Sequence, residues 1–174
     1  LKIDELISNV QIGSNGVIFN PHLAGGGNHY FSENMRGAVV GLTLATRKED
    51  LYRAIYEGIA MELFNLWNQL PTREEDDFPI ILTGGGSKSD VWCQLIADLF
   101  SREMMRGFVS QYTASFGAAA VALRGVGIWK DYSEIDHFLG QGVRIKPNGP
   151  NSEEYKTIKT QYDTWSSMLF DYYK

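Results

Sequence analysis

The sequence predicts an α/β domain in which helices flank a mixed or mostly parallel sheet. Short apolar runs alternate with longer segments of helical periodicity, so strands and helices follow one another along the chain. Three consecutive glycines at 84–86 separate one apolar run from a helix-like segment, as in a tight strand-to-helix turn. With 174 residues, of which 44% are hydrophobic and 13% aromatic, the chain suffices for a single domain with a proper core over 1–174.

The first part of the chain predicts a short helix and two strands. Residues 1–10 carry apolar side chains at helical spacing, and a glycine-containing turn follows them. Residues 17–19 are β-branched or aromatic and predict a buried strand, which ends at an irregular loop with Pro21. Residues 36–44 carry aliphatic side chains between glycines and predict a second strand.

The clearest helix of the sequence comes next. Thr46 and Glu49 have the spacing of a capping box, and no proline interrupts the segment before Pro71. Apolar side chains at helical spacing predict one inward face: Leu51, Ala54, Ile55, Gly58, Ile59, Leu63, Leu66, Trp67 and Leu70. A glycine costs about 1 kcal/mol relative to alanine in an exposed helix, so we expect a close backbone contact at Gly58.

The remaining elements again alternate between strand and helix. Residues 80–82 predict a strand covered on both faces, and Ser87 or Ser89 is expected to cap the helix after the glycine turn. Residues 103–109 predict the next strand. An alanine-rich helix from about 115 to 125 is expected to lie very near a neighbour. An amphipathic helix closes the chain after a loop punctuated by glycine and proline.

Composition argues against several classes of protein. A net charge of −5 without a basic run argues against binding of nucleic acid, and no apolar segment has the length of a membrane span. The single cysteine, Cys93, excludes an internal disulfide and fits a reducing compartment, so we expect a cytoplasmic protein with Cys93 in its core. His22 and His29 lack carboxylates at ligand spacing, so we expect surface residues rather than metal ligands.

The glycine turn is the candidate functional site. Ligands of α/β sheets bind beyond the carboxyl ends of the strands, where this turn is expected to lie. Successive main-chain N–H groups before a helix can hold an anion or a nucleotide, and bare glycines let a base or a phosphate approach closely. The turn is neither a P-loop nor a dinucleotide fingerprint, whose third glycine would fall at Ser89. Taken alone, it is explained equally well as a tight turn without a ligand.

Residues 37–57 resemble the carboxy-terminal signature of the FGGY family of carbohydrate kinases. The residue types of the signature stand at its spacing: Gly37, Val39, Gly41, Leu42, Asp50, Leu51, Ala54, Ile55, Tyr56 and Glu57. The segments PHLAG, LTGGGSKSDVWCQLIADLF and TASFGAAAVA resemble three further family segments, so the similarity covers roughly 10–130. One loop departs from the family, because GGGNHYF at 25–31 lacks the charged residues found there in the family.

The resemblance implies an actin-like ATPase fold of the ribonuclease H-like kind, in a two-domain kinase that transfers the γ-phosphate of ATP to a sugar hydroxyl with Mg²⁺. This chain is similar to the C-terminal, nucleotide-binding half. The N-terminal domain, which carries the catalytic aspartate and most sugar contacts in the family, is not part of it. Gly84, Gly85 and Gly86 would then pack against ATP, and Ser87 and Ser89 would form hydrogen bonds with it. We expect no catalytic residue and no metal ligand in this chain, which alone would be inactive.

The resemblance leaves the sugar and the partners open. It favours a xylulokinase-like enzyme, with gluconokinase and other sugar or polyol kinases as alternatives, and hence a sugar or sugar-acid substrate. A non-catalytic nucleotide-binding module and an interaction domain without a ligand stay open as well. Aromatic side chains in the last helix could pack on its own sheet, on the missing domain or in a homodimer. Asp50, Glu57 and Asp98 fall where the family uses these positions structurally, so none is assigned as a base.

Overall fold

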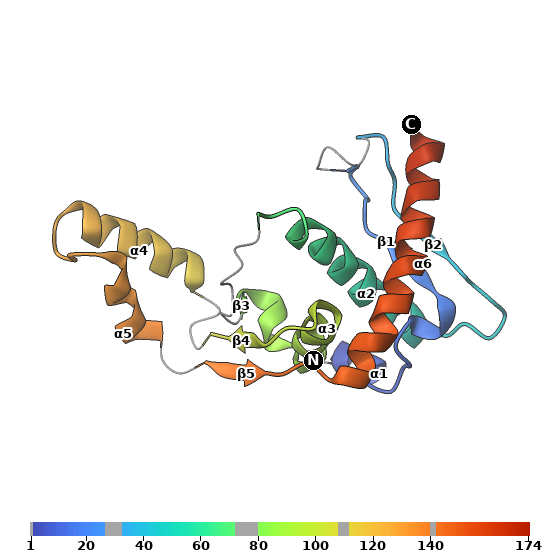
Figure 1. The fold of residues 1–174 in the computed structure, drawn as a ribbon, viewed down its shortest axis with the longest axis horizontal. Helices are drawn as coiled ribbons and strands as arrows, with labels where there is room; N and C mark the ends of the chain where they lie inside the picture. The colour runs from blue at the N-terminus through green and yellow to red at the C-terminus, as the bar shows by residue number, and fades with distance from the viewer. Residues whose placement is uncertain (1, 27–32, 72–79, 108–111, 140–141) are drawn as a thin grey trace.

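The computed structural model describes residues 2–26, 33–71, 80–107, 112–139 and 142–174 and has the predicted α/β character (Figure 1). The helices are α1 (Lys2–Ile7), α2 (Lys48–Trp67), α3 (Asp90–Phe100), α4 (Thr113–Gly125), α5 (Asp136–Leu139) and α6 (Gly149–Tyr173). Single 3₁₀ turns form η1 (Ser14–Gly16), η2 (Gly85–Lys88) and η3 (Tyr132–Ile135). The strands are β1 (Ile18–Asn20), β2 (Ala38–Val40), β3 (Ile80–Leu82), β4 (Met104–Arg106) and β5 (Val143–Ile145).

Two separate sheets organise the fold. β3, β4 and β5 form a mixed sheet in that order, in which β3 and β4 run parallel and β5 runs antiparallel to β4. β1 and β2 form an antiparallel pair that lies beside α2, and Asn20 of β1 bonds Ser166 of α6. In Figure 1, α4 and α5 lie at the end of the molecule opposite to this pair. Because β3 and β4 run parallel, their carboxyl ends lie together at one edge of the mixed sheet.

The core lies where α2, α3, β4 and α6 meet. Its buried side chains are Ala60, Met61, Leu95, Ile96, Ala97, Leu99, Met104, Tyr155 and Tyr162. Leu95, Ile96 and Leu99, which helical spacing places on one face of α3, all belong to this cluster. α6 docks mainly on α3 and α2 rather than on a sheet, and its Trp165 and Tyr172 stay exposed.

The inward face predicted for α2 is largely wrong. Five of its apolar side chains are 36% to 56% exposed: Ile55, Ile59, Leu63, Leu66 and Leu70. The buried face contains Ala54 and Gly58, as predicted, together with Arg53, Glu57 and Met61, which the prediction did not include. Charged groups can occupy this face because they are hydrogen-bonded to one another, whereas part of the apolar stripe lines an open groove of about 550 Å³ beside β3 and α3.

The close contact expected at Gly58 is confirmed. A Cβ atom built on Gly58 would lie 2.0 Å from the carbonyl oxygen of Phe19, so only glycine lets α2 approach β1 this closely. The capping box is shifted by one residue from the prediction. The amide of Arg47 donates to Asp50 Oδ2 at 2.8 Å, while the hydroxyl of Thr46 accepts from the amide of Thr43.

Two further predictions differ from the structure. The sequence places β5 within a loop, because three residues beside glycine and proline give no periodic signal, but pairing with β4 makes this segment a strand. Of the small residues of α4, Ala120 is buried, whereas Gly117, Ala118, Ala119 and Ala122 are exposed in the described structure. A Cβ atom on Gly117 would meet no described atom within 4 Å.

Candidate functional site

The glycine turn follows β3 at the carboxyl edge of the parallel pair, as predicted. Gly84 has φ +81° and ψ −166°, which side chains disfavour, and it turns the chain from β3 into η2. Ser89 then caps α3, because its hydroxyl accepts from the amide of Trp92 at 3.0 Å. The backbone conformation at position 84 is therefore sufficient to explain a glycine there, without any ligand.

Conformation does not explain Gly85, which lies beside open space. A Cβ atom on Gly84 or Gly85 would meet no described atom within 4 Å, and the segment 83–86 is exposed. A Cβ atom on Gly86, in contrast, would lie 3.1 Å from Nε1 of Trp92. The turn thus rests on Trp92 at Gly86 and presents bare main chain to the outside at Gly84 and Gly85.

The two serines of the turn are buried and internally hydrogen-bonded. Ser87 and Ser89 are each 2% exposed. The hydroxyl of Ser87 donates to the carbonyl of Gly84 at 2.8 Å, and that of Ser89 donates to Asp4 Oδ1 at 2.8 Å. Both hydroxyl protons are therefore used within the chain, so the serines hold the shape of the turn.

Side chains from three other elements support the turn. The hydroxyl of Tyr56 in α2 donates to the same Asp4 Oδ1 at 3.4 Å, and its ring meets Trp92 edge-on at 5.7 Å. Burial, and then the Asp4 carboxylate, raise the pKa of Tyr56, which therefore stays protonated as a donor. From β4, Arg106 Nη1 donates to the Ser87 carbonyl at 3.2 Å and to Asp90 Oδ1 at 2.7 Å.

Cys93 lies directly beneath the turn, and its expected core position is confirmed. Its side chain is fully buried, and Sγ lies 3.5 Å from the carbonyl of Ser87. Burial raises the pKa of the thiol, which disfavours the reactive thiolate.

The acidic residues of the signature are engaged in internal hydrogen bonds. Glu57 Oε1 accepts from Arg53 Nε at 2.9 Å, from the Tyr155 hydroxyl at 3.1 Å and from the Gly13 amide at 3.0 Å. Glu57 Oε2 accepts from the hydroxyl of Ser14 at 2.7 Å. Burial, and then the Glu57 charge, raise the pKa of Tyr155, so its hydroxyl stays a donor. This buried carboxylate is fully paired and fastens η1 to α2 and α6.

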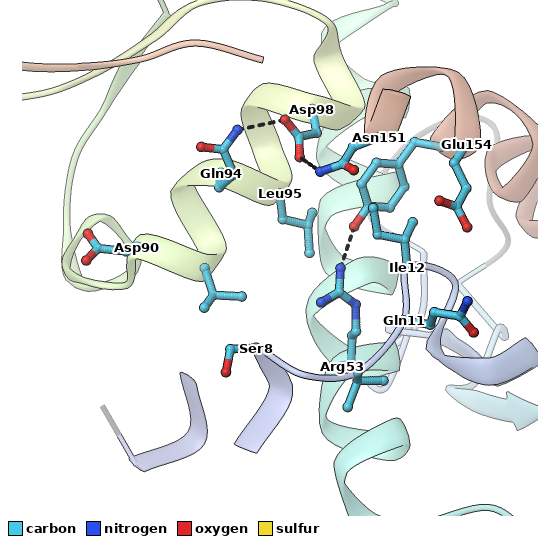
Figure 2. Close-up of a pocket in the computed structure, with 13 residues that line it drawn as sticks. Ser8, Gln11, Ile12, Arg53, Asp90, Gln94, Leu95, Asp98, Asn151 and Glu154 are labelled. Atoms are coloured by element: carbon cyan, nitrogen blue, oxygen red, sulfur yellow. Dashed lines mark hydrogen bonds between the residues drawn. The ribbon is translucent and has the colours of Figure 1, made fainter. Parts of the chain in front are cut away.

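Asp50 and Asp98 have similar structural contacts. Asp50 Oδ1 accepts from Asn15 Nδ2 at 2.8 Å, while its other oxygen caps α2. Asp98 lines a pocket of about 640 Å³ in which it accepts from Gln94 and Asn151 (Figure 2). The amide of Asn148 also donates to Asp98, at 2.7 Å, so this carboxylate anchors the start of α6 on α3.

His22 lies against the protein interior rather than on the surface. Its Nε2 is 3.5 Å from Glu62 Oε2, and 12% of its side chain is exposed. No group of three or more histidine, cysteine, aspartate or glutamate side chains in the described part of the chain could hold a metal ion, and His29 lies outside that part. None of the helices described has the length and apolarity that crossing a membrane requires.

Comparison with known proteins gives the family. The sequence profile of the FGGY family of carbohydrate kinases, C-terminal domain, matches residues 3–126. The chain belongs to this family. The structure also matches that of ligand-bound xylulose kinase from Lactobacillus acidophilus with a TM-score of 0.86 and 28% identity, over 98% of this chain and 35% of that one. The actin-like fold of the FGGY C-terminal domain is thereby confirmed.

Curated relatives within the family act on different substrates. The chain is 29% identical to gluconokinase of Bacillus subtilis (strain 168), over 98% of this chain and 33% of that protein. It is 33% identical to glycerol kinase of Enterococcus faecalis (strain ATCC 700802 / V583), over 95% of this chain and 32% of that protein. The chain thus spans about a third of the length of the relatives that it matches.

Sequence reasoning missed the side chains that support the turn. Asp4 lies 85 residues before its partner Ser89, and Arg106 lies 19 residues after Ser87. Neither stands in a motif, so no local signal could have identified them. Only the folded chain brings them together with Tyr56 and Trp92 around one turn.

Proposed function

We propose that this chain forms the nucleotide-binding part of a two-domain carbohydrate kinase and that ATP lies against the turn at Gly84–Gly86. The observation that carries the proposal is the bare, outward-facing main chain of Gly84 and Gly85 at the carboxyl edge of β3 and β4. A side chain at either position would fill the space that a nucleotide needs. Conformation accounts for a glycine at 84 but not for one at 85.

The residues of the turn fit ATP by shape and polarity. Gly84, Gly85 and Gly86 would contact the nucleotide through main-chain atoms near the start of α3, where N–H groups and the helix dipole favour negative charge. Ser87 and Ser89 are buried, so we assign them an indirect role, in which they fix the turn that the nucleotide meets. ATP would supply the γ-phosphoryl group that a sugar hydroxyl accepts.

We assign no magnesium site to the described residues. Their acidic side chains do not gather into a cluster that could hold a metal ion, and Asp50, Glu57 and Asp98 have the structural partners given above. We therefore assign no metal ligand and no general base to this part of the protein. The family implies Mg²⁺, and in our proposal its ligands and the acceptor site belong to the other domain, so the chain alone would be inactive.

The substrate is proposed as a sugar or sugar acid, with a xylulokinase-like activity first. The match to xylulose kinase supports this choice. Gluconate and glycerol kinases follow as alternatives, because relatives with those activities match at similar identity. The aligned third of these proteins does not separate the three substrates.

A test of the proposal uses the intact protein that contains this chain. ATP is titrated by calorimetry, and phosphoryl transfer from ATP to xylulose, gluconate and glycerol is measured in parallel. Hydrogen exchange of the amides of Gly84–Gly86 is followed with and without ATP. We expect ATP to bind, to protect these amides and to phosphorylate one of the three acceptors. ATP binding without transfer to any acceptor would favour a non-catalytic nucleotide-binding module. If ATP produced no heat and did not protect these amides, the result would favour an interaction domain.

A further inference from the structure

Arg106 connects the mixed sheet to the glycine turn and to the start of α3. It is the last residue of β4 and pairs in register with Leu82, the last residue of β3. Its Nη1 donates to the carbonyl of Ser87 in η2 and to Asp90 Oδ1 at the start of α3, at 3.2 Å and 2.7 Å. One guanidinium nitrogen therefore joins the parallel strand pair, the turn and the helix.

These contacts differ in kind from the other supports of the turn. The hydroxyls of Ser87 and Ser89 form hydrogen bonds within the buried side of the segment. Arg106 contributes charge-assisted bonds, which are shorter and stronger than neutral ones. Its side chain is 26% exposed and that of Asp90 is 86% exposed, so the pair lies at the outer edge of the turn.

We propose that Arg106 is a positioning residue for nucleotide binding, because it fixes the main chain of the turn relative to the edge of the sheet. This inference rests on the proposed function. Arg106 acts through Ser87 and Asp90, and contact with the nucleotide itself is made by the glycines. Its loss would remove the tie from β4 and leave the contacts of the turn with Asp4, Trp92 and Cys93.

If Arg106 mainly stabilised the whole fold, removal of its charge would lower the melting temperature. Ion pairs with one largely exposed partner contribute little to folding, as expected for a pair whose aspartate is 86% exposed. Removal of the Arg106 charge should therefore change the melting temperature little, while a turn that is less well ordered binds nucleotide more weakly. Separate measurements of stability and ATP affinity distinguish the two roles.

The test compares Arg106→Met with Arg144→Met in the intact protein. Arg144 is a matched control, because it lies on the neighbouring strand β5, is 64% exposed and pairs with Glu103, away from the turn. We expect Arg106→Met to raise the KM for ATP about tenfold, which corresponds to the loss of one charge-assisted hydrogen bond. The kcat and the KM for the sugar should stay within about twofold, and Arg144→Met should match the parent.

Two more variants keep the inference testable if Arg106→Met folds poorly. Arg106→Lys retains the charge and should recover part of the ATP affinity. Asp90→Asn alters only an exposed side chain and should raise the KM for ATP about threefold, because Arg106 keeps its bond to Ser87. Equal ATP KM values for folded Arg106→Met, Arg144→Met and the parent would overturn the inference but leave the nucleotide site intact. Failure of the parent itself to bind ATP would overturn the proposed function.

Discussion

Replacement of Gly85 by valine should weaken nucleotide binding while the fold is kept. Gly85 does not have a positive φ, and a Cβ atom there meets no described atom within 4 Å, so the folded chain can accept a side chain. Substitution of a glycine in a compatible conformation changes stability by up to about 1 kcal/mol. For a chain of this length, that corresponds to a shift in melting temperature of roughly 2–4 °C.

The effect of this substitution on ATP should be much larger. The new side chain would occupy the open side of the turn, where the proposed contact needs bare main chain. We expect a loss of at least about 2.7 kcal/mol in binding, or roughly a hundredfold increase in the Kd for ATP. Calorimetric titration of the intact protein measures this change, and circular dichroism records the melting temperature of the same sample.

A matched control and a clear contrary result complete the test. Gly125 at the end of α4 also lacks a positive φ, and a Cβ atom there would likewise meet no described atom within 4 Å. Gly125→Val should therefore leave ATP affinity unchanged. If folded Gly85→Val bound ATP as tightly as the parent, the nucleotide could not lie against this turn.

Three other substitutions test the supports of the site. Gly58→Ala would place Cβ 2.0 Å from the Phe19 carbonyl and should cost about 3 kcal/mol, seen as a fall in melting temperature of roughly 6–12 °C. Glu57→Gln leaves the Arg53 charge without its carboxylate and should cost about 3 kcal/mol in urea unfolding, whereas Glu154→Gln on the exposed side of α6 should cost little. Ser89→Ala removes the cap of α3 and should cost about 1 kcal/mol, with a rise in ATP Kd of less than tenfold. A hundredfold rise for Ser89→Ala without destabilisation would instead indicate direct contact with ATP.

The order of strand, glycine turn and helix around 80–100 was predictable because its signals are local. Three apolar residues, three glycines and a capping serine follow closely on one another, and each indicates its own backbone conformation. The core face of α3 follows from helical spacing for the same reason. The bare main chain of the candidate site could therefore be found from the sequence.

The orientation of α2 was not predictable from periodicity. Its apolar stripe is the stronger pattern, but Arg53 and Glu57 turn inward because Tyr155, about 100 residues later, completes their hydrogen bonds. A hydropathy pattern assigns such charged residues to the surface, because it contains no information on hydrogen-bond partners so far along the chain. β5 was missed for the same reason, because only its pairing with β4 makes this segment a strand.

Several residues of the FGGY signature make structural contacts away from the glycine turn. Gly41 admits the backbone of Gly16, because a Cβ atom there would lie 2.0 Å from its carbonyl oxygen. Asp50 and Glu57 bind Asn15 and Ser14 of the same η1 turn. These ties hold α2 against η1, and in this position Tyr56 lies against Trp92 and Asp4. Since Trp92 underlies Gly86 and Asp4 bonds Ser89, the signature helix helps set the shape of a glycine turn that its own acidic residues do not touch.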